Sequence, residues 1–170
     1  MQVVELGTRT LENHYVVECF DKDGNLKWAE EFDNLVTTEG LNDSLNKHFK
    51  ASAYTASWFV GLVNGASAPT YAAGDTLASH AGWTELAPGT AYTGNRQALT
   101  LGTVAAGSVD NSASKAVFPI LANNTVAGAF ICTAATGTSG ILYGEGNFTG
   151  GNRSVVNGDT LNVTITLTAS

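Results

Sequence analysis

Beyond residue 50 the chain is a series of short apolar segments separated by turns rich in Gly and Asn. Sixteen of the nineteen glycines lie in this part. The clearest segment, Thr160–Thr168, alternates Leu, Val and Ile with Thr and Asn, as a strand with one buried face does. Further strands are expected at Ser57–Val63, Gly82–Leu86, Gln97–Leu101, Ala116–Leu121, Val126–Thr133 and Gly140–Tyr143. Short strands without helices between them predict a mainly β fold, an antiparallel β-sandwich or jelly roll.

The first 33 residues predict a short lead-in and a β-hairpin. The strands His14–Phe20 and Leu26–Phe32 are rich in aromatic and aliphatic residues. The turn between them, Asp21–Asn25, contains Gly24, which can adopt a positive φ without strain. The sequence therefore divides into an N-terminal lead-in and hairpin, residues 1–33, and a β-sandwich body, residues 34–170.

One short α-helix is expected within the body, from about residue 38 to residue 50. Thr37 or Thr38 can cap its N-terminus, and Glu39 in the first turn interacts favourably with the helix dipole. Three apolar side chains recur at helical spacing and should pack against the body: Leu41, Leu45 and Phe49. The opposite face should meet water through its polar side chains: Asn42, Asp43, Asn46 and Lys47.

Charge is scarce and unevenly placed. Charged residues make up 14% of the chain, where about 25% is usual for a soluble domain. Residues 51–170 hold only five acids and three bases of the chain's 15 acids and 8 bases. Permanent protein interfaces are depleted in Lys, Glu and Asp, so a neutral β body is typical of a structural subunit.

The same composition argues against several classes of protein. The net charge of -7 and the absence of clustered Lys and Arg exclude a protein that binds nucleic acid by neutralising phosphates. No uncharged stretch reaches the roughly 18 consecutive apolar residues of a membrane-spanning helix, so no membrane partner is expected. The first residues, Met1–Leu6, lack the basic and apolar segments of a secretory signal.

Residues that could carry catalysis or bind a metal are few and show no diagnostic spacing. The histidines, His14, His48 and His80, form no metal-binding pair, and Cys19 and Cys132 are expected to be buried thiols. We therefore expect no enzymatic activity, no cofactor and no metal site. A glycan hydrolase, the least favoured alternative, would draw on the carboxylates of Asp75, Glu85, Asp110, Glu145 and Asp159.

Six residues are candidates for structural or interface roles: Trp28, Phe32, Trp58, His80, Trp83 and Arg96. Trp58 and Trp83 are interpreted as core anchors, with a sugar-stacking platform as the alternative. His80 is expected to be a hydrogen-bonded loop histidine. Gly82 should allow a close backbone approach that lets Trp83 plug one end of the sandwich. Arg96 should pair with Glu85 or donate to backbone carbonyls.

Five strings, taken together and in order, resemble a family of small virion proteins of tailed bacteriophages. The resemblance covers about residues 34–168. The strings are Asn34-Leu35-Val36-Thr37-Thr38-Glu39-Gly40-Leu41-Asn42, Trp58-Phe59-Val60-Gly61-Leu62, Asp75-Thr76-Leu77-Ala78-Ser79-His80-Ala81-Gly82-Trp83-Thr84-Glu85, Asn95-Arg96 and Gly158-Asp159-Thr160-Leu161-Asn162-Val163-Thr164.

This resemblance implies a capsid decoration, or cement, protein that binds outside the major capsid shell and bridges its subunits. The family has a β-sandwich or jelly-roll body, and its implied partners are the major capsid protein and further copies of itself, as a dimer or trimer. It implies no catalysis and no cofactor. The expected location is the capsid exterior of the virion, after synthesis in the cytoplasm of the bacterial host. The alternative is a structural protein of the phage tail, fibre or baseplate with receptor or glycan binding.

Overall fold

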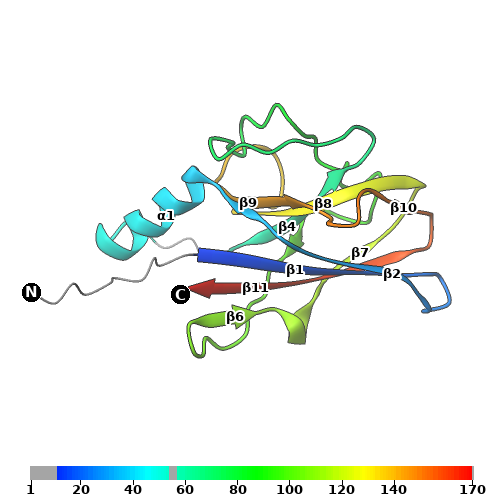
Figure 1. Ribbon diagram of the computed structural model, residues 1–170, viewed down its shortest axis with the longest axis horizontal. Helices are drawn as coiled ribbons and strands as arrows, with labels where there is room; N and C mark the ends of the chain where they lie inside the picture. Colours follow the sequence, from blue (N-terminus) through cyan, green and yellow to red (C-terminus); the bar gives the residue numbers. More distant parts are fainter. Residues whose placement is uncertain (1–10, 54–56, 170) are drawn as a thin grey trace, which may run out of the picture.

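The computed structural model describes residues 11–53 and 57–169 of the chain. These residues form two antiparallel β-sheets packed as a sandwich, and one short helix, α1 (Thr38–Phe49), projects from one end (Figure 1). The predicted mainly β fold, with an N-terminal hairpin and one helix, is confirmed. Residues 1–10 of the expected lead-in lie outside the described residues.

The hairpin strands belong to the first sheet. Its order is β2-β1-β11-β6, with β7 also paired to β11. The strands are β1 (Leu11–Phe20), β2 (Leu26–Asp33), β6 (Ser108–Asp110), β7 (Ala116–Pro119) and β11 (Thr160–Ala169). β1 pairs with β11 over its whole length, from Leu11 opposite Ala169 to Phe20 opposite Thr160. The hairpin strands β1 and β2 therefore share one sheet with strands β6, β7 and β11 of the body.

The second sheet has six strands in the order β3-β9-β8-β4-β5, with β10 also paired to β8. Its strands are β3 (Leu35–Val36), β4 (Phe59–Asn64), β5 (Gln97–Ala98), β8 (Asn124–Cys132), β9 (Leu142–Asn147) and β10 (Arg153–Val155). β8 is the central strand, flanked by β4 on one side and by β9 and β10 on the other.

Most of the expected strands are present, but Gly82–Leu86 is not a strand. Within it only Glu85 forms a β-bridge, to Val63, because Gly82 is held against another loop. An ideal Cβ at Gly82 would lie 2.2 Å from the carbonyl oxygen of Thr70, so only glycine fits there. The strand expected at Gln97–Leu101 is shortened to β5. Three short strands, β3, β6 and β10, were not expected, because segments of two or three residues are too short to show an alternation of apolar and polar side chains.

Two hydrophobic cores lie on the two faces of the six-stranded sheet. The main core fills the space between the sheets, and a second core lies on the outer face under residues 65–83, which we call the covering segment. It forms part of the green connection above β4, β8 and β9 in Figure 1. β8 serves both cores: Val126, Ala129 and Ile131 face the main core, while Ala127, Phe130 and Cys132 face the second. This explains why all seven residues from Val126 to Cys132 are buried.

The helix packs against the body with the opposite side from the one expected. The apolar residues Leu41, Leu45 and Phe49 are 40%, 55% and 76% exposed. The side chains of Asp43 and Lys47, which were expected in water, are only 9% and 17% exposed and form an ion pair at 3.4 Å. The expectation that the apolar face packs against the body is therefore wrong within a single chain.

The reason lies in the first turn of the helix. Gly40 is buried against the backbone of Tyr143, where an ideal Cβ would lie 2.6 Å from the carbonyl oxygen. Thr37 is the N-cap, as one of the two expected alternatives, and its hydroxyl accepts from the Gly40 N–H at 3.0 Å. The carboxylate of Glu39 accepts from two backbone N–H groups, those of Leu77 and Leu142. These contacts fix the helix with Gly40 facing the body. Asp43 and Lys47 follow three and seven residues later, so helical spacing places them on the same inward side.

The turn between Ala105 and Ser108 offers a simple test of backbone strain. Ala106 and Gly107 both have positive φ, 51° and 77°, as in a type I′ turn. Alanine is disfavoured in this region and asparagine is tolerated. We expect Ala106→Asn to stabilise the protein by about 0.5–1 kcal/mol, measured as a higher midpoint in urea unfolding. Gly107→Ala is the matched control and should destabilise, because its Cβ would lie 2.8 Å from the Ala169 carbonyl oxygen.

Candidate functional site

The six candidate residues from the sequence lie at three places in the fold. One group gathers on the outer face of the six-stranded sheet: His80, Trp83 and Arg96. Two pack against the main core from the hairpin: Trp28 and Phe32. The sixth lies beside α1 at one end of the sandwich: Trp58.

Trp83 is the centre of the first group. It is 4% exposed, and its ring lies 4.9 Å from that of Phe130 on β8. The His80 imidazole stacks on the indole with 3.9 Å between centroids, and its Nδ1 lies 3.2 Å from the Trp83 carbonyl oxygen. His80 is thus the hydrogen-bonded loop histidine that was expected. Trp83, however, does not plug an end of the sandwich: it fixes the covering segment to the outer face.

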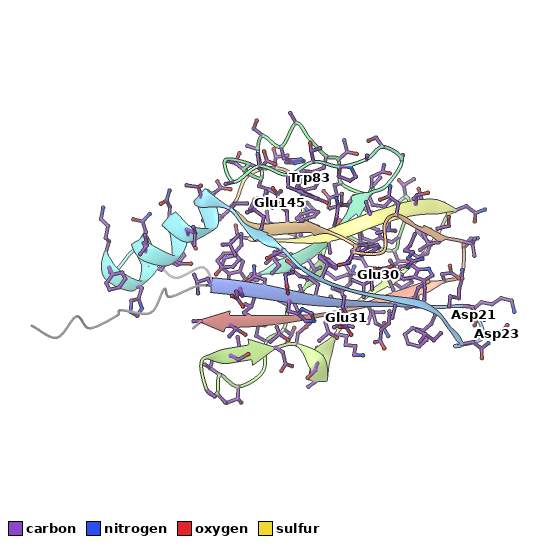
Figure 2. The ribbon with its side chains drawn as sticks, in the orientation of Figure 1. Asp21, Asp23, Glu30, Glu31, Trp83 and Glu145 are labelled. Carbon is purple, nitrogen blue, oxygen red and sulfur yellow. The ribbon has the colours of Figure 1, made fainter. Side chains whose placement is uncertain are left out.

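Trp83 also forms a hydrogen bond with a fully buried carboxyl group. Its indole N–H donates to Oε2 of Glu145 at 2.8 Å, and Glu145 on β9 is 0% exposed. Figure 2 shows the two residues next to each other at the top of the fold. The second oxygen of Glu145, Oε1, has no donor within the described part of the chain. The neighbouring carboxyl group belongs to Asp75 of the covering segment, and it raises the pKa of Glu145.

A hydrogen bond between two carboxyl groups requires a proton, because ionised carboxylates only accept. Burial raises the pKa of Glu145 to about 8, and the charge and hydrogen bond of Asp75 act in the same direction, against the hydrogen bond from Trp83. The raised pKa favours the neutral, protonated form of Glu145, in which its carboxyl group can donate to Asp75. The hydrogen bond from Trp83 to Glu145 thus fixes the covering segment to β9.

Arg96 lies beside this cluster and is 6% exposed. Its guanidinium donates twice to Glu85, from Nε at 2.8 Å and from Nη2 at 2.7 Å, and once to the Ala134 carbonyl at 2.9 Å. It also lies 5.3 Å from the centre of the Phe130 ring. Both expected contacts, with Glu85 and with a backbone carbonyl, are confirmed. Burial alone would lower the pKa of Arg96, but the hydrogen bonds to Glu85 raise it above its usual value, so the pair is ionic.

The acids named for a hydrolase do not all lie together. Asp75 contacts Glu145, whereas Glu85 is engaged by Arg96, so two of the acids named for a hydrolase have different partners. Within residues 11–53 and 57–169, no three His, Cys, Asp or Glu side chains gather as a metal-binding group. In the same residues no helix is long and apolar enough to cross a membrane.

Trp28 and Phe32 pack around Phe148, whose ring centroid lies 5.7 Å and 5.6 Å from theirs. The Trp28 indole N–H donates to the Ser154 carbonyl at 3.3 Å. Between them on β2 lies Glu30, labelled in Figure 2, which is 5% exposed and forms an ion pair with the arginine that begins β10. These residues join the hairpin to β10 and do not form an exposed aromatic platform.

Trp58 lines an apolar hollow of about 320 Å³ between α1 and the ends of the two sheets. Its ring meets that of Tyr143 edge to face, with centroids 5.4 Å apart. Leu101, Val109 and Leu167 contribute further apolar walls. Trp58 is thus half-buried, and it faces a space that the described residues leave open.

Residues 57–169 expose even less charge than their composition suggests. Their three bases all form ion pairs: Arg96 with Glu85, Lys115 with Glu18, and Arg153 with Glu30. In a fourth pair, Asp159, which is 2% exposed, contacts Lys27. Three of these four pairs take one partner from the hairpin. Most of the charged residues in 57–169 that form ion pairs therefore have a hairpin residue as their partner.

The outward side of the five-stranded sheet carries a row of threonines on β11, and we call the outward side chains of β1 and β11 the threonine face. Alternate side chains of β1 and β11 point inward and are buried, while the others remain half-exposed. In register, Val16 lies opposite Thr164 and Glu18 opposite Asn162. The face consists of His14, Val16, Glu18, Phe20, Thr160, Asn162, Thr164, Thr166 and Thr168. Glu18 of this face is paired with Lys115 at 2.7 Å. Further acids lie on the same side of the sheet: Glu12 opposite Thr168, Glu31 and Asp33 of β2 opposite Val16 and His14, and Asp110 of β6 opposite Thr166.

Sequence reasoning missed two features of these sites. Glu145 was noted only as one acid among five, and its sole signal was its position at the end of a long uncharged stretch. The outward apolar side of α1 had no sequence signal, because spacing alone does not say which side of a helix meets the body. Cys19 and Cys132 are buried free thiols, as expected.

No known protein-family model matches this chain, and no curated protein shows significant sequence similarity to it.

Proposed function

We propose that this protein is a bacteriophage capsid decoration protein that binds the outside of the major capsid shell and stabilises it by bridging subunits. The proposal draws on the five strings that resemble small virion proteins and on the scarcity of charge in residues 51–170. The protein acts through binding alone, with the major capsid protein and with further copies of itself.

The observation that carries the proposal is the threonine face. Removing charged groups from water at an interface is costly, so surfaces that remain permanently covered contain few of them. The centre of the threonine face, on β11, offers methyl and hydroxyl groups on a rigid sheet, and the acids of this side lie on the neighbouring strands β1, β2 and β6. Weak contacts of this kind gain strength when many copies bind a symmetric lattice.

Cryo-electron microscopy of the virion tests the location directly. The expected result is density for the sandwich on the capsid exterior, with the threonine face against the shell. Density in the tail, fibre or baseplate would overturn the proposal and favour the alternative, which sugar-dependent quenching of tryptophan fluorescence would then examine.

A surface substitution tests the face itself. Thr164 lies in the middle of the threonine face, and Thr164→Arg would place an unpaired charge in the interface. We expect at least about a tenfold loss of binding to capsids that lack the protein, measured by co-sedimentation. Ser67→Arg adds the same charge at an exposed position of the covering segment and should leave binding unchanged. Equal binding by both variants would contradict the use of this face.

A further inference from the structure

The covering segment, residues 65–83, lies over the six-stranded sheet without adding a strand to it. No strand of the described chain falls within the segment, and the β-bridge between Thr76 and Ser79 is internal to it. The Thr70 N–H donates to the Gly82 carbonyl at 3.0 Å, which closes the segment into a loop. A loop that is not part of the strand pairing can open while the sheet beneath it stays intact.

Apolar packing and hydrogen bonds hold this loop on the sheet. Leu77 and Trp83, 0% and 4% exposed, pack in the second core. The Leu77 N–H donates to the carboxylate of Glu39 on α1 at 3.3 Å, and the Trp83 indole N–H donates to Glu145 on β9 at 2.8 Å. Glu145 is 0% exposed, so its protonation decides whether a charge is buried beneath the covering segment.

The surroundings of Glu145 suit its neutral form. Its Oε1 has no donor among the described residues, and Asp75 of the covering segment lies next to it. Burial raises the pKa of Glu145 to about 8, and the charge of Asp75 adds to this effect. A buried carboxylate that lacks donors is costly, because it has lost its hydrogen bonds to water. Detachment of the covering segment would return Glu145 to water and move Asp75 away from it.

No ion pair within the described part of the chain offsets the charge of an ionised Glu145. Arg96, the nearby guanidinium, is paired with Glu85 at 2.7 Å. Burial raises the pKa of Tyr71, Tyr15 and Cys132, so these groups remain neutral up to pH 8. The titratable and charged groups on the elements packed around Glu145 are Asp75, Tyr71 and His80 of the covering segment, Glu39 of α1, Cys132 of β8, Tyr15 of β1, and Arg96 with Glu85.

We propose that Glu145 and Asp75 form a pH-sensitive switch for the covering segment: the segment stays closed while Glu145 is protonated and detaches locally when Glu145 ionises. The two sheets and the main core stay folded as it opens. The pKa of Glu145 is raised in the closed form above its ordinary value of 4.5. The closed form therefore has its full stability below about pH 4.5 and loses it as the pH rises to about 8. This proposal does not depend on the proposed function.

Hydrogen exchange measured by mass spectrometry at pH 6, 7 and 8 tests it on the full chain. Glu145→Gln is measured at the same pH values, because the ratio of the two rates removes the intrinsic effect of pH on exchange. For peptides that contain Leu77 we expect this ratio, unmodified chain over variant, to rise about tenfold per pH unit. In the unmodified chain, peptides from β1 and β11 should exchange at least about tenfold more slowly than these at each pH.

Two further variants complete the experiment. Glu31→Gln removes an acid at an exposed position of β2 and should exchange as the unmodified chain does. Asp75→Asn keeps Glu145 but removes the neighbouring charge, so it should show a smaller rise with pH. Equal exchange of the Leu77 peptides in the unmodified chain and Glu145→Gln at all three pH values would overturn the proposal. So would an acceleration that the Leu77 peptides share with β1 and β11 at equal rates, because Glu145 would then ionise only on global unfolding.

Discussion

Replacing Arg96 with alanine will destabilise the fold by about 3–5 kcal/mol, because it leaves a largely buried carboxylate without its partner. The Arg96 side chain is 4% exposed and that of Glu85 19% exposed, so water cannot replace the two lost hydrogen bonds fully. The Ala134 carbonyl loses its donor as well. Chemical denaturation should show this as a large fall in the urea midpoint with an unchanged slope.

A double-mutant cycle separates the pair from the packing of the arginine stem. Arg96→Met keeps most of the apolar stem and should also be strongly destabilised. Combining it with Glu85→Gln removes the stranded charge and should recover a large part of the loss. If the two substitutions change the free energy of unfolding additively, Arg96 and Glu85 are not energetically coupled, which would contradict the stabilising role of the ion pair.

Replacing Glu145 with glutamine will make the stability of the protein less sensitive to a rise in pH between about 4.5 and about 8. The pKa of Glu145 is about 8 in the fold, against an ordinary value of 4.5. Across this interval the folded chain keeps a proton that the unfolded chain releases. The fold therefore loses about 1.4 kcal/mol per pH unit as the pH rises from about 4.5 to about 8. Glutamine cannot ionise, can accept from Trp83 and can donate to Asp75, so the variant should lack this loss.

The measurement is urea unfolding of both proteins at pH 5, 6.5 and 8. The stability of Glu145→Gln relative to the unmodified chain should increase at each step, so that the variant is the more stable protein at pH 8. Glu31→Gln changes the net charge equally at an exposed position of β2 and serves as the control. A difference between Glu145→Gln and the unmodified chain that stays constant from pH 5 to pH 8 would show that Glu145 is ionised throughout.

The elements in which apolar residues recur at a regular spacing were predictable from the sequence. Thr160–Thr168 alternates because one side of β11 faces the main core and the other faces outward. The helix start was predictable because a threonine cap and a first-turn glutamate act locally. β8 instead reads as a continuous apolar run, because the covering segment buries its second face. Its length therefore indicated a strand, but the missing alternation could not show which core each side chain joins.

The features that depend on distant segments were not predictable. Glu145 and Trp83 are 62 residues apart, and the pKa of Glu145 depends on the fold bringing Trp83 and Asp75 to it. The orientation of α1 depends on the backbone of Tyr143, which a glycine at position 40 can approach closely enough. Arg96 and Glu85 are only eleven residues apart, which is why their pairing could be anticipated.

The pairing of β1 with β11 also decides the order in which the protein can be completed. These strands stand at opposite ends of the described chain, yet they share ten register positions at the centre of one sheet. During synthesis β1 can pair only with β2, and its other edge stays open until β11 has left the ribosome. Closing the sheet thus joins the first and last strands across nearly the whole sequence. Such non-local pairing makes folding slow, on the order of milliseconds to seconds.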